Sequence, residues 1–254
     1  MIDSHTHLYV EEFEVDIDAV MQRAWEKGVQ KMYLPAIDSQ THAAMMAVED
    51  RYKGRCFAMI GIHPCSIKGD YKNELAIVEQ LLKQRNFAAI GETGLDFYWD
   101  TSFVEEQYIA LEKQIEWALQ YDLPLVLHTR NAIPETIEVI QKYTHTSLKG
   151  IFHCFGGTLE EAHQIIACNF LLGIGGVVTY KKAGLDVVLP KIGLEHIVLE
   201  TDAPYLSPAP HRGKRNESSY LPEIAKKIAE IKGLDVAMVV KQTTLNAEKV
   251  FKMG

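Results

Sequence analysis

The chain has 254 residues, 47% of them hydrophobic, which suits one large domain or two small ones with a sizeable core. Its formal net charge of −8 excludes a general nucleic-acid-coating function, because the overall charge would repel phosphate. A phosphate-containing substrate would therefore need a local positive site.

Short apolar runs alternate with amphipathic helical patterns along the chain. Several of these runs are apolar on consecutive residues, as at 88–90 and 125–127, which is typical of parallel strands buried on both faces. The predicted strands are 1–5, 31–37, 56–62, 87–92, 124–128, 150–155, 170–175 and 196–201.

Helices are predicted between these strands, and two more close the chain. Ser102 with Glu105, and Thr158 with Glu161, have the spacing of capping boxes that open helices. Eight strand–helix units in about 250 residues predict an α/β fold of the closed (β/α)₈ TIM-type barrel class. An open doubly wound sheet is the alternative, but it usually has fewer strands, and no GxGxxG follows the first strand. We expect a single domain over residues 1–254.

Ionisable side chains recur at the carboxyl ends of the predicted strands. Residues two apart on a strand share a face, so His5 and His7 project together. In a barrel these strand ends meet at one mouth, where barrel enzymes carry their chemistry. The residues at this rim are His5, His7, His63, Glu92, His128, His153 and Asp202. Imidazoles and carboxylates in such numbers predict two divalent metal ions, with a carboxylate of Glu92 or Asp202 shared between them.

The motifs around these residues resemble the TatD family of metal-dependent deoxyribonucleases, part of the amidohydrolase-like barrel superfamily. The resemblance runs from residue 1 to beyond 216, with the motifs in order. They are Ile-Asp-Ser-His-Thr-His at 2–7, Gly-Ile-His-Pro at 61–64, Gly-Glu-Thr-Gly-Leu-Asp-Phe at 91–97, Leu-His-Thr-Arg at 127–130, Phe-His-Cys-Phe-Gly-Gly at 152–157, Leu-Glu-Thr-Asp-Ala-Pro-Tyr at 199–205 and Pro-His-Arg-Gly-Lys-Arg-Asn at 210–216.

The resemblance implies a ligand set and an activity. One metal would be held by His5, His7, Glu92 and Asp202, and Glu92 would bridge to a second metal held by His128 and His153. The implied activity is magnesium-dependent exonuclease cleavage of DNA from 3′ ends. Histidine ligands suit Zn, Mn or Ni better than Mg, which prefers oxygen, so the metal identity stays open among these four.

Other residues near the rim are candidates for substrate contact. His63 is expected to contact a substrate phosphate, or alternatively to hydrogen-bond a metal ligand, and Arg130 is expected to face the mouth. Arg212 and Lys214 lie in a basic loop after strand eight, where they would clamp phosphate unless the loop is simply solvated. Glu200 is predicted to orient a metal ligand.

An aromatic segment, Phe97–Trp99, follows Glu92 and either stacks a nucleobase or packs over the barrel. Stacking would favour single-stranded or frayed 3′ ends of DNA, because a terminal nucleotide must leave a duplex before it can reach the metals. We expect a metal-activated water to attack a phosphodiester, with Asp202 as metal ligand and general base.

Two other functions remain open from the sequence. The same barrel and metals could hydrolyse an amide, ester or lactone, since neither fixes the substrate. A non-catalytic binding protein is the other alternative, although the intact ligand set argues against it. We expect a monomer or weak oligomer.

The cellular location is expected to be the cytoplasm. The four cysteines, at 56, 65, 154 and 168, lack a CxxC spacing and are interpreted as reduced thiols. The first eight residues are not a basic segment followed by an apolar one, so no signal peptide is predicted. No apolar run approaches the roughly 18 residues of a membrane span, and no membrane contact is expected.

Overall fold

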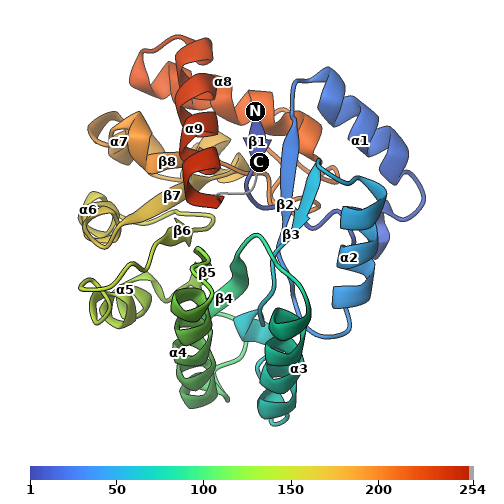
Figure 1. The fold of residues 1–254 in the computed structure, drawn as a ribbon. Helices are drawn as coiled ribbons and strands as arrows, with labels where there is room; N and C mark the ends of the chain where they lie inside the picture. The colour runs from blue at the N-terminus through green and yellow to red at the C-terminus, as the bar shows by residue number, and fades with distance from the viewer. Residues whose placement is uncertain (252–254) are drawn as a thin grey trace.

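Eight parallel strands alternate with helices in a computed structural model of the chain, which describes residues 1–251. The helices surround the strands (Figure 1). The strands are β1 Ile2–Asp3, β2 Lys31–Leu34, β3 Cys56–Ala58, β4 Ile90–Asp96, β5 Leu125–Arg130, β6 Gly150–Phe152, β7 Phe170–Ile174 and β8 Ile197–Leu199. The helices are α1 Ile17–Glu26, α2 His42–Arg51, α3 Tyr71–Gln84, α4 Val104–Gln120, α5 Ile133–Gln141, α6 Leu159–Ala167, α7 Leu185–Val188, α8 Leu221–Lys232 and α9 Val236–Phe251.

The strands close into a barrel through two seams. Regular parallel pairing gives one sheet of β1 to β3 and another of β4 to β8, each in sequence order. At the first seam, the backbone N–H of Ile60 donates to Ala89 O at 3.0 Å, and that of Gly91 donates to Ile60 O at 2.9 Å. At the second, the N–H of Ser4 donates to Leu199 O at 3.0 Å. The predicted (β/α)₈ barrel is confirmed.

Helix α9 closes the amino end of the barrel. The inner face there carries a separate apolar cluster from the strands, which includes Ile2, Tyr33, Met59, Val126, Ile151 and Val198. Ala247, Val250 and Phe251 of α9 pack into this cluster, and the ring of Phe251 stacks on Tyr33 at a centroid distance of 3.7 Å. The larger core lies around this barrel, and the carboxyl ends of the strands are left for the polar site.

The predicted strand boundaries need one correction that affects the site. Strand four was expected at 87–92, but β4 begins at Ile90 and continues to Asp96, so Glu92 lies inside the strand rather than at its end. A register shift follows Ile90, and beyond it Gly94 pairs with His128 and Asp96 with Arg130. The carboxyl half of β4 therefore carries a second acidic residue into the site.

One of the two predicted capping boxes is wrong. Helix α4 begins at Val104 without a side-chain cap, because the backbone N–H of Ser102 donates to Asp100 Oδ1 at 2.9 Å and Ser102 lies in the preceding turn. The other is confirmed, since Thr158 and Glu161 exchange both bonds at the start of α6.

Among residues 1–251, no helix combines the length and apolar character that crossing a membrane would require. The single domain over 1–254 stays a prediction, and its last three residues lie outside the described part of the chain.

Candidate metal centre

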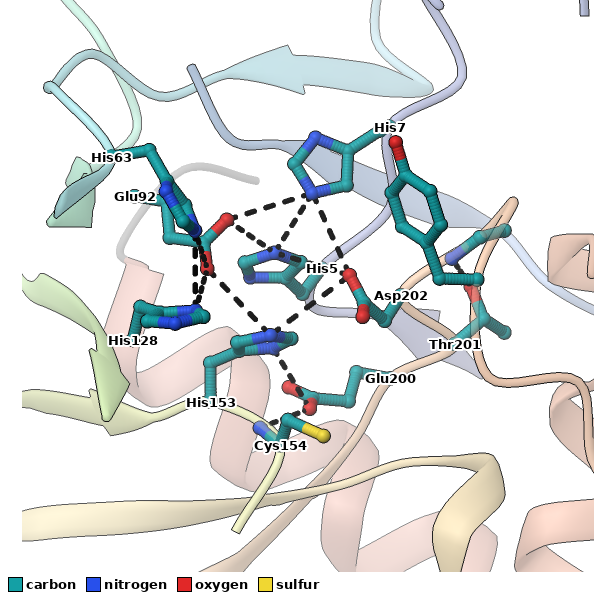
Figure 2. A network of polar contacts seen from close by, with 12 residues as sticks. His5, His7, His63, Glu92, His128, His153, Cys154, Glu200, Thr201 and Asp202 are labelled. Atoms are coloured by element: carbon teal, nitrogen blue, oxygen red, sulfur yellow. Dashed lines mark hydrogen bonds and ion pairs between the residues drawn. The ribbon is translucent and has the colours of Figure 1, made fainter. Parts of the chain in front are cut away.

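The rim histidines and carboxylates converge at the carboxyl end of the barrel (Figure 2). His5 and His7 follow β1, and their Nε2 atoms are 3.3 Å apart. Glu92 Oε2 lies 3.1 Å from His5 Nε2 and 3.5 Å from His7 Nε2. These atoms form a buried group of two nitrogens and one oxygen.

The other oxygen of Glu92 faces a second group of histidines. Glu92 Oε1 lies 3.0 Å from His128 Nδ1, 3.5 Å from His63 Nε2 and 3.7 Å from His153 Nε2. Figure 2 shows His63 and His128 on one side of the carboxylate and His5 on the other. The two oxygens of Glu92 thus point into two different nitrogen clusters.

Asp202 approaches both clusters from the segment that follows β8. Its Oδ1 is 3.5 Å from His7 Nε2, 3.7 Å from His5 Nε2 and 3.9 Å from His153 Nε2. The Asp202 side chain is 14% exposed, compared with 2% for Glu92, so Asp202 lies nearer the opening. Burial alone would raise the pKa of Asp202, but His153 and His7 lower it, which keeps the carboxylate ionised.

These donors fit divalent cations. Nitrogen and carboxylate lone pairs that converge at 3.0–3.5 Å repel one another unless a proton or metal lies between them. Burial alone would raise the pKa of Glu92, but nearby His5 and His63 hold it well below its usual range. A mixed set of imidazoles and ionised carboxylates is the donor chemistry that divalent transition metals prefer.

Hydrogen bonds fix how the His7 ring faces the site. The Tyr9 hydroxyl donates to Pro35 O at 2.5 Å, so its oxygen is left to accept from His7 Nδ1 at 2.9 Å. Neutral His7 then carries its proton on Nδ1 and presents the Nε2 lone pair to Glu92 and the neighbouring donors. Tyr9 was not identified from the sequence, and it lies in a turn that the backbone N–H of Val10 closes by donating to His7 O at 3.2 Å.

Glu200 lies behind His153. His153 Nδ1 is 3.0 Å from Glu200 Oε1, which also accepts the backbone N–H of Cys154 at 2.6 Å. A Cβ on Gly173 would lie 2.2 Å from Glu200 Oε2, so the carboxylate occupies space that only glycine leaves free. Burial alone would lower the pKa of His153, but Glu200 and Asp202 raise it to about 9, and a cation that binds there must displace a proton.

Asp96 is a site residue that sequence reasoning did not single out. Its Oδ2 lies 2.7 Å from His128 Nε2, the ring nitrogen on the far side from Glu92. A signal was present, because Asp96 is four residues after Glu92 and a strand brings residues i and i+4 to one face. The predicted end of the strand at Glu92 concealed it.

The residues expected to contact substrate are only partly brought together. The Cζ atom of exposed Arg130 is 4.0 Å from the Tyr98 ring centroid and 5.5 Å from that of Trp99. These rings are 51% and 68% exposed, whereas Phe97 packs against the hydrophobic core and is not part of the exposed pair.

The basic loop after β8 contains cations in different environments. Arg212 lies over the Tyr180 ring at 3.9 Å, and its neighbour Lys214 is exposed. Arg215 instead makes two hydrogen bonds of 2.8 Å to the carboxylate of Asp16. Two cations of the loop therefore remain for a ligand, and the third is part of the fold.

Comparison with known proteins gives one family over the whole barrel. The family model described as TatD related DNase matches residues 2–252. An uncharacterized metal-dependent hydrolase, YabD of Bacillus subtilis, is 34% identical over 255 residues, covering all of both chains. The 3′-5′ ssDNA/RNA exonuclease TatD of Pectobacterium atrosepticum is 34% identical over 263 residues, again covering all of both chains.

A solved structure agrees with this result. YJJV, a TatD homolog from Escherichia coli, superposes with a TM-score of 0.94 at 27% identity, covering 100% of this chain and 98% of its own.

Proposed function

Because this chain belongs to the TatD related DNase family and is a metal-dependent hydrolase, we propose that it cleaves phosphodiester bonds of nucleic acid with two metal ions. We further propose that it acts as a 3′ exonuclease on DNA. The relative from Pectobacterium is named as an exonuclease for single-stranded DNA and RNA, which supports this substrate class.

The observation that carries the two-metal proposal is the orientation of Glu92. Its two oxygens face two separate nitrogen clusters at 3.0–3.7 Å, which is how a bridging carboxylate would be placed. One metal would be held by His5, His7, Asp202 and Glu92, and a second by His128, His153 and Glu92. Divalent ions held there would supply Lewis acidity and positive charge for the attack of water on a phosphodiester.

Asp202 is placed to act as the general base. It is ionised, it lies nearer the opening than Glu92, and its backbone N–H donates to His5 O at 2.9 Å, which holds it beside the first cluster. A carboxylate in this position can accept the proton of the attacking water. Glu92 is enclosed and serves both clusters instead.

The tautomer of His63 suits a hydrogen-bond donor to substrate. The backbone N–H of Cys65 donates to His63 Nδ1 at 3.0 Å, so a neutral His63 carries its proton on Nε2. That N–H points toward Glu92 and His128, where it can donate to a phosphate oxygen.

The outer residues support a nucleic-acid substrate. Tyr98 and Trp99 present exposed rings with Arg130 over them, and stacking on such rings is available to any base. Arg212 and Lys214, in the loop after β8, would supply positive charge for phosphate despite the net charge of −8. Together these residues favour a nucleic-acid strand over a small ester as the substrate.

The proposal is tested with 5′-labelled oligonucleotides of single-stranded DNA, RNA and duplex DNA, each with Mg, Mn, Zn or Ni. We expect a ladder shortened from the 3′ end on single-stranded DNA, absent in the Glu92→Ala variant and blocked by a 3′-terminal phosphorothioate. Internal cuts would contradict the exonuclease assignment. Hydrolysis of lactones or esters without any cleavage of oligonucleotides would support the small-molecule alternative.

We propose a cytoplasmic protein, since the four cysteines are unpaired and a reducing compartment keeps thiols so. We also propose a monomer or weak oligomer.

A further inference from the structure

Hydrogen bonds link His128 of the second cluster to Asp96, and Asp96 to the backbone of the aromatic pair. His128 Nε2 lies 2.7 Å from Asp96 Oδ2, and an ionised carboxylate can only accept. The proton of neutral His128 is therefore on Nε2, and its Nδ1 lone pair faces Glu92 Oε1 at 3.0 Å. Two acceptors at that distance repel one another unless a proton or a metal lies between them, and this is the place given above to the second metal.

The other oxygen of Asp96 holds the exposed aromatic pair. Asp96 Oδ1 accepts the backbone N–H of Tyr98 at 2.9 Å and that of Trp99 at 3.0 Å. Arg130, which lies over both rings, is two residues after His128 on the adjacent strand. One buried carboxylate thus contacts both a metal-facing imidazole and the start of the segment that presents the rings.

The surrounding backbone holds Asp96 close to His128. Gln107 brackets Asp96, accepting its N–H at 2.9 Å and donating to its carbonyl at 3.3 Å. Gly94 has φ of 134°, and a Cβ there would lie 2.0 Å from His128 O. Only glycine allows β4 to lie this close to β5, and the short separation lets Asp96 reach the ring of His128.

We propose that Asp96 is a positioning residue that fixes His128 as the Nε2–H tautomer and, through its second oxygen, ties that metal ligand to the Tyr98–Trp99 platform. This inference rests on the two-metal site proposed above. Such outer hydrogen bonds set the orientation and basicity of a ligating imidazole, and their loss weakens metal binding.

The decisive variant is Asp96→Asn. The amide oxygen can keep both backbone N–H bonds, which leaves the amide NH₂ opposite His128 Nε2. Two donors cannot face each other, so the His128 proton must move to Nδ1 and the lone pair no longer faces the metal position. Zinc titration by calorimetry should show the first equivalent unchanged and the second about 10–100-fold weaker.

A matched control is Asp100→Asn in the same loop. Asp100 contacts Lys68 and the N–H of Ser102, so its substitution should leave both zinc equivalents as in the wild type. If Asp96→Asn binds the second zinc ion as tightly as the wild type does, the positioning role is overturned and the two-metal site is left intact. A wild-type protein that binds fewer than two zinc ions would contradict the two-metal site and this inference together.

A spectroscopic measurement reports the tautomer itself. With ¹⁵N-labelled histidine and zinc bound, His128 of the wild type should show a protonated Nε2, and Asp96→Asn should show the proton on Nδ1. A wild-type His128 without a proton on Nε2 would overturn the inference, even if the variant failed to fold. The Asp100→Asn spectrum should match that of the wild type.

Discussion

Asp3 accepts two hydrogen bonds from Thr201, one from its backbone N–H at 2.9 Å and one from its hydroxyl at 2.6 Å. The two residues are 198 positions apart in the sequence, and the pair joins β1 to the segment after β8. Burial raises the pKa of Asp3 to about 7, despite the bonds from Thr201 that lower it. The seam of the barrel therefore contains a carboxyl group that titrates near neutrality.

Stability should fall as pH rises through the range set by Asp3. The folded state binds the proton more tightly than the unfolded state, so the stabilisation is complete below about pH 4 and is lost as pH rises toward 7. The wild type should lose free energy of unfolding between pH 5 and pH 8, and Asp3→Asn should not lose this contribution. The difference between variant and wild type should therefore be about 3 kcal/mol more favourable to the variant at pH 8 than at pH 5. Urea denaturation at both pH values measures this difference.

Asp100→Asn is the control for that experiment. Hydrogen bonds from Lys68 and Ser102 lower the pKa of Asp100 to about 2, so it stays ionised at both pH values and its variant should show no pH-dependent difference. An Asp3→Asn effect of equal size at pH 5 and pH 8 would show that Asp3 does not titrate between them.

The two site carboxylates should be essential for activity and dispensable for the fold. Glu92→Ala should lose both metals and Asp202→Ala one, because each cluster faces its own oxygen of Glu92 at 3.0–3.1 Å, whereas the nearest approach of Asp202 to the second cluster is 3.9 Å. Hydrolysis should fall by at least about 10²–10⁴-fold in each, the range expected for loss of a general base. Metal analysis, circular dichroism and the nuclease assay measure these effects, and near-wild-type activity in either variant would refute the site.

The basic loop should act on binding. Arg212→Ala and Lys214→Ala should each weaken binding of a phosphorothioate oligonucleotide and reduce the slope of log affinity against log salt by about 0.7, the value per phosphate contact on a single strand. Arg215→Ala provides the contrast, since Asp16 already neutralises Arg215 and the variant should lower the melting temperature instead. Unaltered affinity in the first two variants would identify the loop as a solvated surface.

Single-stranded ends should be cleaved faster than blunt duplex ends of the same sequence. A terminal base must leave the duplex at a cost of a few kcal/mol, and stacking on a ring returns about 1–3 kcal/mol. Trp99→Ala and Tyr98→Ala should lower kcat/KM on a single strand by about tenfold each, which corresponds to the lower half of that stacking range. Phe97→Ala should mainly reduce stability, because Phe97 packs against the core. Equal rates on both substrates, with kcat/KM unchanged in Trp99→Ala and Tyr98→Ala, would show that the protein holds the nucleic-acid strand by its phosphates alone.

The side chains that converge at the carboxyl end of the barrel could be picked out from the sequence because each lies at or just after an apolar run. His5, His128 and His153 follow from strand geometry and from the way barrel strands converge. Glu92 was identified despite a wrong strand boundary, because its place directly after an apolar run does not depend on where the strand ends.

The partners of those side chains were harder to predict. Asp96, Tyr9 and Pro35 act through distances between elements that no local pattern encodes. The Ser102 capping box failed because Asp100 competes for the same turn. Long-range pairs such as Arg215 with Asp16 depend on how the loops fold over the barrel, which periodicity does not report.

The stacking of Phe251 on Tyr33 has a consequence for how the protein is made. The floor of the barrel is complete only after α9 has been synthesised, and the whole polar site is synthesised earlier. A nascent chain on the ribosome therefore already contains every histidine and carboxylate of the site while the apolar interior beneath it is still open to water. Docking of α9 is then the folding step that covers the apolar interior at the amino end of the barrel.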